Sequence, residues 1–327
     1  MSHILKSKLK QLTFKHQNNK IWYYFRNNVR RLFTSFIFRN RLGKKLRSLE
    51  EFDLDYIQKR VDYYNRLEAG TTLPANTPEL SKLKLGKELK VYYFDSYEYT
   101  RFFNPQLNAE FLFGDIIHIP EVASFVKSRP INGDNTNSIV LKLDKIRHFR
   151  LIKDTKKFIN KKNLLISRGQ VYQPHRLRFL EMYFNHPMCN IGQINITEDK
   201  RFLVNRMTVD EHLDYKFILC LEGNDVASNL KWVMSSNSLA VMSKPTYETW
   251  FMEGTLIPNF HYVLIKDDYS DLEERLVYYS EHTEDALRII ENAHQYISQF
   301  KNRKQEDLVS LLVVKKYFDN TGQKVTV

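Results

Sequence analysis

Short apolar runs that end at polar or glycine residues recur through the middle of the chain. The clearest run is 217–221, which a glycine-containing polar turn at 222–225 follows. A helical pattern comes next, with Leu230, Val233 and Met234 on one face. A strand, a tight turn and a helix in this order are typical of a βα unit in a parallel sheet. We therefore predict an α/β protein.

Other short apolar stretches predict further strands. They are 91–94, 111–113, 122–126, 164–166, 239–242 and 262–265. Helices are expected over residues 1–69 and 271–300, where apolar residues recur at helical spacing. The stretch from Gly70 to Pro78 is rich in Gly, Pro and Thr, which indicates a loop between the N-terminal helices and the body of the protein.

Length and composition indicate a folded, globular chain. The 327 residues suffice for two ordinary domains or one large one, and 43% hydrophobic residues provide for a packed core. Cys189 and Cys220 lie far apart among apolar neighbours, which favours reduced, buried thiols over a disulfide or a metal site. No apolar stretch reaches the ~18–20 residues of a membrane-spanning helix, and no secretory signal pattern is found. We therefore expect a cytoplasmic protein.

Positive charge is concentrated at the N-terminus. Thirteen Lys and Arg and no Asp or Glu precede Glu50, whereas the rest of the chain holds 37 basic and 38 acidic residues. Apolar and aromatic residues are interleaved with these charges between Ile21 and Phe38. Such an arm suits an anionic membrane surface, a nucleic acid, or packing on the body with its lysines in solvent. The pattern alone leaves all three open.

Basic residues also gather just beyond predicted strands or early in predicted helices. They are Lys127, Arg129, Arg168, Arg176, Arg178 and Lys231. Because open α/β sheets bind ligands at the carboxyl ends of their strands, this pattern indicates a phosphate-bearing ligand. The Lys231 ammonium could reach a phosphate at the start of its helix. The alternative interpretation is an ordinary βα unit with a surface lysine. The chain lacks the G-x-x-x-x-G-K-[ST] and G-x-G-x-x-G patterns, which counts against P-loop hydrolysis and ordinary dinucleotide binding.

Acidic residues offer a few further candidates. Asp115 follows a predicted strand and Gly114, a place that suits a general base or an N-cap of the next turn. Glu248, in a helix predicted to open after Pro245, could bind ribose hydroxyls or simply favour the helix N-terminus. The only D-x-D, at residues 53–55, fits a solvated helix face. His-x-x-x-His and Cys-x-x-Cys patterns are absent, which argues against a catalytic zinc.

Several separate motifs together resemble the family 90 glycosyltransferases. The motifs are Glu222-Gly-Asn-Asp-Val-Ala-Ser-Asn-Leu-Lys-Trp232, Ser235-Ser-Asn-Ser238, Lys244-Pro-Thr-Tyr-Glu-Thr-Trp250, Pro258-Asn-Phe-His-Tyr262 and residues 267–274, with Phe113-Gly-Asp115, 124–130 and 167–176 upstream. The likeness spans roughly residues 90–300 with its blocks in order, and the arm before residue 70 lies outside it. The family includes bacterial lipopolysaccharide-modifying transferases, fungal capsule-associated proteins and eukaryotic protein O-glucosyltransferases, and the bacterial branch fits best.

This resemblance implies the GT-B architecture, in which two Rossmann-like domains face each other across a cleft. It also implies a UDP-activated sugar donor, inversion of the anomeric configuration and no metal or other cofactor. We accordingly expect a basic helical arm over 1–78, a Rossmann-like acceptor domain over 79–200 and a UDP-sugar-binding domain over 201–300. The remaining segment, 301–327, would pack back on the N-terminal domain.

The resemblance and the residue pattern together suggest roles for individual residues. Asp115 matches the family's catalytic base, which deprotonates the acceptor hydroxyl. The diphosphate-binding candidates are Arg168, Gly169, Arg176, Lys231, Gly223, Asn224 and Ser228. The nucleoside- or sugar-binding candidates are Glu222, Asp225, Asn229, Ser235, Ser236, Asn237 and Glu248, and the acceptor-side candidates are Lys127, Arg129 and His118. Without a metal, protein groups must stabilise the charge on the departing UDP. The eukaryotic branch has an arginine where Asn229 stands and Arg-Gly where Glu222-Gly223 stands, so its diphosphate contacts and donor sugar do not transfer directly.

We therefore expect an inverting, metal-independent transferase that moves a hexose from a UDP-sugar to a hydroxyl of a lipopolysaccharide core or another surface-glycan acceptor. It would lie on the cytoplasmic face of the inner membrane, held to anionic lipid by residues 1–48, with no nucleic-acid partner. Two alternatives stay open, a basic nucleic-acid-binding protein and a non-catalytic member of the family that binds a glycan or nucleotide.

Overall fold

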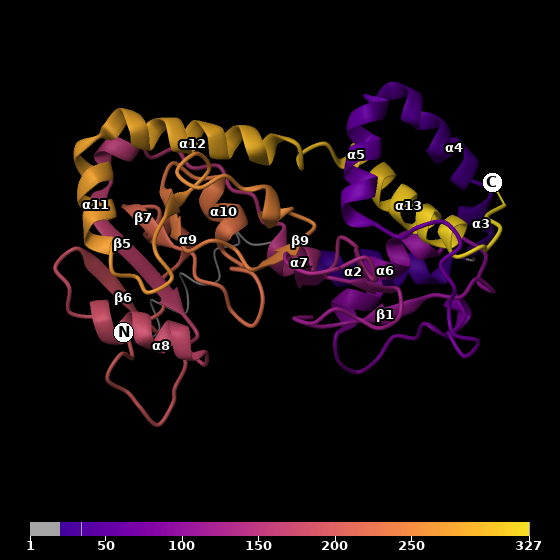
Figure 1. The fold of residues 1–327 in the computed structure, drawn as a ribbon, viewed down its shortest axis with the longest axis horizontal. Helices are drawn as coiled ribbons and strands as arrows, with labels where there is room; N and C mark the ends of the chain where they lie inside the picture. Colours follow the sequence, from indigo (N-terminus) through magenta and orange to yellow (C-terminus); the bar gives the residue numbers. More distant parts are fainter. Residues whose placement is uncertain (1–19, 34, 327) are drawn as a thin grey trace. The chain divides into compact units, whose positions relative to one another are not determined.

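The computed structural model describes residues 20–33 and 35–326, and the chain forms two compact units. Within the described residues, unit 1 comprises 148–245 and 255–299. Unit 2 comprises the described residues up to 147 together with 246–254 and 300–326 (Figure 1). Both units contain parallel β-sheet and helices, which confirms the predicted α/β class.

Unit 1 is built on a five-stranded parallel sheet of order β10-β8-β7-β5-β6. The strands are β5 (Lys162–Gly169), β6 (Cys189–Gln193), β7 (Tyr215–Leu219), β8 (Leu239–Met242) and β10 (Val263–Leu264). Numbered within this sheet, the order is 2-1-3-4-5, which is common in doubly wound α/β proteins. The direction of winding reverses between β5 and β7, and such a switch point is where these sheets bind ligands.

Helices connect and cover these strands. They are α8 (Pro174–Tyr183), α9 (Val209–His212), α10 (Leu230–Met234), α11 (Leu272–Glu281) and α12 (Thr283–Ser298), with short 3₁₀ turns at Phe158–Asn160 and Glu253–Thr255, the latter at the junction with unit 2. On one face of the sheet, Leu165, Phe217 and Val263 pack with Phe179 of α8 and Leu276 of α11. This apolar cluster fixes α8 against β5 and so positions the loop that follows β5.

Unit 2 contains a three-stranded parallel sheet of order β1-β2-β4 and an antiparallel pair, β3-β9. Its strands are β1 (Glu110–Leu112), β2 (Ser124–Val126), β3 (Ser128–Pro130), β4 (Ser138–Val140) and β9 (Tyr247–Thr249). Its helices are α2 (Lys20–Leu32), α3 (Ser35–Arg39), α4 (Leu42–Arg47), α5 (Leu54–Tyr64), α6 (Lys90–Thr100) and α13 (Arg303–Asn320), with α7 (Lys145–His148) at the junction and 3₁₀ turns at Ser48–Glu51 and Leu80–Lys82.

Trp250 fastens the inserted segment 246–254 into unit 2. Its ring stacks on Tyr64 of α5, with ring centroids 3.9 Å apart, and its Nε1 donates to Glu306 Oε2 of α13 at 2.7 Å. Three separate chain segments therefore meet in one core. The division that the sequence predicted at residue 200 differs from this arrangement, because β5 and β6 pair into the same sheet as β7. An apolar run predicts a strand but does not show which strands pair.

Most predicted elements are confirmed, with two errors. Residues 91–94 lie in α6 and not in a strand; this helix buries side chains on nearly all sides, so it lacks the one-sided pattern of a surface helix. Glu248 lies in β9 and not at the start of a helix. The helical prediction for 1–69 is confirmed from α2 to α5, and residues 1–19 lie outside the described chain. Within the described residues, every helix is too short or too polar to span a bilayer.

Candidate active site

One arginine joins the two loops that flank the switch point of unit 1. Arg176, in the first turn of α8, donates from Nη1 to the carbonyl of Gln170, directly after β5, at 2.8 Å. From Nε and Nη2 it donates to the carbonyls of Glu222 and Leu221, after β7, each at 2.8 Å. The guanidinium therefore bridges the carboxyl ends of the two strands between which the sheet reverses its winding.

Two of the predicted diphosphate-binding glycines border this guanidinium. A Cβ built on Gly223 would lie 3.4 Å from Arg176 Nη2, and one built on Gly169 would lie 3.9 Å from Nη1. The structure thus brings Arg176, Gly169 and Gly223 together, although they lie far apart in the sequence. The Gly223 N–H itself donates to the Asp225 carbonyl at 2.9 Å, which closes the turn after β7.

Polar side chains continue around the same turn. The His175 Nε2–H donates to the Glu222 carbonyl at 2.9 Å, and Gln173 Nε2 donates to Asn224 Oδ1 at 2.8 Å. Asn229, where the eukaryotic branch carries arginine, donates from Nδ2 to the last carbonyl of β7, Leu219, at 2.9 Å. Within this loop Asp225 is buried and Ser228 is exposed.

The Arg176 guanidinium is positioned by neutral hydrogen-bond acceptors. Burial lowers the pKa of its guanidinium. Among the described residues, its hydrogen-bond acceptors are backbone carbonyls, which orient the group but do not neutralise it. A positive charge placed at a switch point by carbonyls suits an anionic ligand, since the ligand supplies the missing negative charge.

Lys231 lies close to this site but inside the protein. Its side chain is fully buried in α10, so it is not the surface lysine of the simpler interpretation. Burial raises the pKa of the Cys220 thiol, directly after β7, and the Lys231 charge lowers that pKa in part. The ammonium therefore lies near the carboxyl end of β7.

Arg168 points away from the Arg176 cluster. Leu165 packs with α8, and because side chains alternate along a strand, Ile166 and Arg168 point to the other face of the sheet. There Arg168 donates to the carbonyls of Asn190 (2.7 Å) and Asn205 (3.2 Å) and to Asn190 Oδ1 (2.6 Å). These bonds tie the end of β5 to β6 and to the loop that contains Asn205, and no described contact joins Arg168 to Arg176.

Ser235, Ser236 and Asn237 lie near the amino-terminal ends of the strands, whereas the switch-point loops lie at the carboxyl ends. They follow α10, which returns to the edge where the strands begin. Their neighbour Ser238 hydrogen-bonds the Tyr215 carbonyl at the start of β7. Ser235 accepts from the Ile152 N–H at 3.0 Å, and Asn237 donates to carbonyls of residues 154 and 156. These predicted sugar-binding residues fix a loop and are not gathered with Arg176.

Asp115 lies at the carboxyl edge of the sheet in unit 2. Gly114, whose φ of +115° favours glycine, turns the chain just after β1. Asp115 Oδ1 accepts from Lys127 Nζ at 2.5 Å and from Arg147 Nη2 at 3.1 Å. Burial raises the pKa of this carboxyl, but the hydrogen bond and charge of Lys127, together with Arg147, outweigh burial and hold the pKa below its usual value. Asp115 is therefore an ionised carboxylate between two cations.

Two other predicted site residues of unit 2 form a buried pair. Arg129 Nε donates to Glu248 Oε1 at 2.8 Å, and Tyr63 hydrogen-bonds the other carboxylate oxygen. Arg129 also donates to the carbonyls of Ser138 (3.0 Å) and Tyr63 (2.7 Å). The pair links β3, β9 and α5, which gives both residues a structural role.

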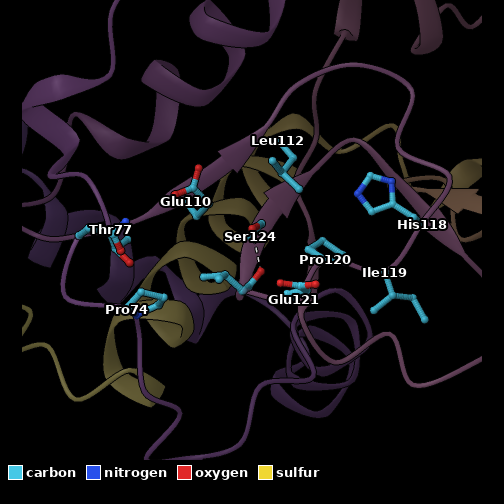
Figure 2. Close-up of a pocket in the computed structure, with 11 residues that line it drawn as sticks. Pro74, Thr77, Glu110, Leu112, His118, Ile119, Pro120, Glu121 and Ser124 are labelled. Atoms are coloured by element: carbon cyan, nitrogen blue, oxygen red, sulfur yellow. Dashed lines mark hydrogen bonds between the residues drawn. The ribbon is translucent and has the colours of Figure 1, made fainter.

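His118 lines an open groove of about 450 Å³ on unit 2 (Figure 2). Glu110 and Ser124, the first residues of β1 and β2, line it too, so it reaches the edge of the sheet opposite Asp115. Glu121 and Thr77 add a carboxylate and a buried hydroxyl that has no hydrogen-bond partner among the described residues. Carboxylates and hydroxyls of this kind suit the hydroxyl groups of a sugar.

Sequence reasoning missed Arg147 and His175 as site residues. Arg147 is 32 positions from Asp115, and its contact depends on how β1 and β4 are placed in one sheet. His175 directly precedes Arg176, and its place in the first turn of the predicted helix is the sequence signal that could have indicated it. Among the described residues, no group of three or more His, Cys, Asp or Glu side chains is placed to hold a metal ion.

Comparisons with known proteins agree on one family. The sequence profile of glycosyl transferase family 90 matches residues 144–317, which include the switch point of unit 1 and begin after Asp115. The chain is also similar to the O-glucosyltransferase LpsA of Dichelobacter nodosus, with 45% identity over 263 residues. That alignment covers 80% of this chain and 82% of the relative.

Proposed function

The chain belongs to glycosyl transferase family 90 and is a glycosyltransferase, and on this premise we propose that it moves a hexose from a UDP-sugar to a hydroxyl, with inversion and without a metal. The acceptor is a lipopolysaccharide core or another surface glycan. The similar protein is named an O-glucosyltransferase, which favours glucose as the sugar and oxygen as the acceptor atom. In this proposal the units form a GT-B enzyme, with unit 1 for the donor and unit 2 for the base.

The observation that carries the donor half is the Arg176 guanidinium at the switch point. It is positioned by three carbonyls and bordered by Gly169 and Gly223, so a diphosphate can approach it closely. When the bond from the anomeric carbon to UDP breaks, negative charge grows on the leaving phosphate oxygen. Arg176, with the Lys231 charge near the end of β7, would stabilise that charge in place of a metal.

Asp115 carries the acceptor half. The acceptor oxygen attacks the anomeric carbon from the side opposite UDP, and its proton passes to the Asp115 carboxylate, so the configuration inverts. Lys127 and Arg147 keep the carboxylate ionised, which is the state a general base needs.

Replacing Asp115 by Asn tests the reaction. We expect Asp115→Asn to lower kcat about 10²–10⁴-fold, the usual contribution of a general base, and to leave the Kd for UDP-glucose within about twofold. Turnover is measured as UDP release with EDTA present, a condition in which a metal-independent enzyme keeps its activity, and binding is measured by calorimetry.

Asp134→Asn is the matched control, since Asp134 is an exposed aspartate of the same unit. It should leave both quantities unchanged. Full turnover in Asp115→Asn would remove Asp115 as the base. A wild-type protein that binds UDP-glucose but never turns it over would favour the non-catalytic alternative.

A further inference from the structure

Helix α2 contacts the body of unit 2 through Tyr23 and through polar side chains. The Tyr23 hydroxyl donates to Asp95 of α6 at 2.8 Å, and Arg30 pairs with Glu98 of the same helix at 2.6 Å. Asn27, one turn after Tyr23, is buried as well. These contacts fix one side of α2, so the other side of the helix is turned outward.

Large apolar side chains are exposed on α2 and on α3. Seven large apolar side chains between residues 21 and 37 are between 40% and 83% exposed. They are Ile21, Trp22, Phe25, Leu32, Phe33, Phe36 and Ile37, here called the outer face. A helix at a water-exposed surface normally buries its large apolar residues, whereas α2 buries Tyr23 but leaves Ile21, Phe25 and Leu32 exposed. Exposed apolar side chains of this size and number within one segment indicate a binding partner.

Exposed cations accompany the outer face along the chain. They are Lys20, Arg31, Arg41, Lys44, Lys45 and Arg47, and no Asp or Glu occurs between residues 20 and 49. A second copy of the chain would bring like charges together. A nucleic acid would match the cations but would leave the aliphatic and phenylalanine side chains in water. An anionic lipid surface accommodates both, because its headgroups are negative and its acyl boundary is apolar.

We propose that the outer face of α2 and α3 is a membrane-docking surface, which inserts its apolar side chains at the acyl boundary while the cations contact lipid phosphates. The inference rests on the proposed function only in that the acceptor glycan would be membrane-borne. Because α2 is fixed to α6, the surface docks unit 2, the unit that contains Asp115.

Vesicle binding by the full-length protein tests the surface directly. The variant Ile21→Ser/Phe25→Ser/Leu32→Ser should bind vesicles of phosphatidylglycerol and phosphatidylethanolamine at least about tenfold more weakly than wild type. The control Ile159→Ser/Ile257→Ser/Leu287→Ser changes three similarly exposed apolar residues of unit 1 and should bind as wild type. Lys44→Gln/Lys45→Gln/Arg47→Gln should also weaken binding and reduce its salt dependence. These substitutions test the surface more specifically than a deletion of residues 1–48, because the deletion would also expose α6 to solvent.

Tryptophan fluorescence supplies an independent readout. The chain has three tryptophans, and Trp232 and Trp250 are buried, whereas Trp22 is 58% exposed. Vesicles should therefore shift the emission to shorter wavelength, and brominated lipid should quench it. Trp22→Phe should abolish both signals while it retains binding, and vesicles of phosphatidylcholine alone should give a much smaller shift.

These measurements separate docking from catalysis. All variants should keep wild-type thermal unfolding and wild-type turnover of a soluble acceptor, so loss of vesicle binding alone supports the proposal even if the sugar donor differs. Wild-type vesicle binding by the Ile21/Phe25/Leu32 variant would overturn it. Self-association through the outer face without lipid binding would overturn it too. So would RNA binding that displaces vesicles and is unchanged by the serine substitutions.

Discussion

Asp115 is held by two cations of very different exposure. Lys127 is buried, with only 1% of its side chain exposed, whereas the Arg147 side chain is 48% exposed and also pairs with Asp144 at 2.8 Å. Both cations favour the ionised carboxylate and so hold the Asp115 pKa down. Arg147 is the cation to change, because its removal leaves the buried Lys127 paired with Asp115.

Arg147→Gln should move the acidic limb of the activity profile to higher pH. Without the Arg147 charge the pKa of Asp115 rises toward its usual value, so the base becomes protonated at a higher pH as the solution is acidified. For a half-exposed cation we expect a shift of about half a pH unit to one unit, measured as kcat/KM against pH on a soluble acceptor.

The same substitution has a linked effect on stability. A carboxyl with a lowered pKa in the folded state stabilises the fold above its unfolded pKa, and this contribution is lost as pH falls through the folded pKa. In Arg147→Gln the folded pKa lies closer to the unfolded one, so the contribution lost on acidification should be smaller and its loss complete at a higher pH. Lys156→Gln, which removes an exposed cation paired with Asp214 in unit 1, is the control. An unchanged acidic limb in Arg147→Gln would mean that Asp115 does not limit the reaction.

At the scale of elements, helix α13 closes unit 2 through one buried carboxylate. Glu306 accepts from Lys142 at 2.8 Å and from Trp250 at 2.7 Å, and it pairs with Arg60 of α5. Burial raises its pKa, but Lys142 and Arg60 hold that pKa below its usual range. The carboxylate therefore joins four chain segments, from α5, from the stretch after β4 that contains Lys142, from 246–254 and from α13.

Glu306→Gln should destabilise the protein by about 3–5 kcal/mol, because it leaves the buried Arg60 charge without its anion. Asp319→Asn, on the same helix, removes the exposed pair with Lys315 and should cost less than about 1 kcal/mol. Urea denaturation followed by circular dichroism measures both. Equal effects of the two substitutions would mean that the Glu306 network does not hold unit 2 together.

The sequence predicted the strands and the turns after them, because apolar runs and glycines are local signals. It identified Arg176, Gly169 and Gly223 through the family resemblance, and the structure places them together. Pairing is not local, so Arg168 and Asn237 could not be assigned to a face or an edge of the sheet before the strand order was known. The strand predicted at 91–94 was wrong for a related reason: a run of four apolar residues fits a buried helix as well as a strand.

At the scale of the whole molecule, each unit draws on distant parts of the chain. Unit 1 is interrupted by 246–254, and unit 2 is completed by α13. The two proposals accordingly concern different units. Donor binding concerns the loops after β5 and β7 in unit 1, and lipid docking concerns α2 and α3 in unit 2.

Hydrogen–deuterium exchange should resolve these two events in one protein. UDP-glucose should slow exchange in residues 169–176 and 219–225, because a ligand that binds the folded loops suppresses their local opening. Anionic vesicles should slow exchange in residues 20–39 and leave the switch-point loops as they were. The Ile21/Phe25/Leu32 serine variant is the control: it should lose the vesicle effect and keep the UDP-glucose effect. If UDP-glucose does not slow exchange at the two loops in a protein that still turns it over, the diphosphate binds away from Arg176.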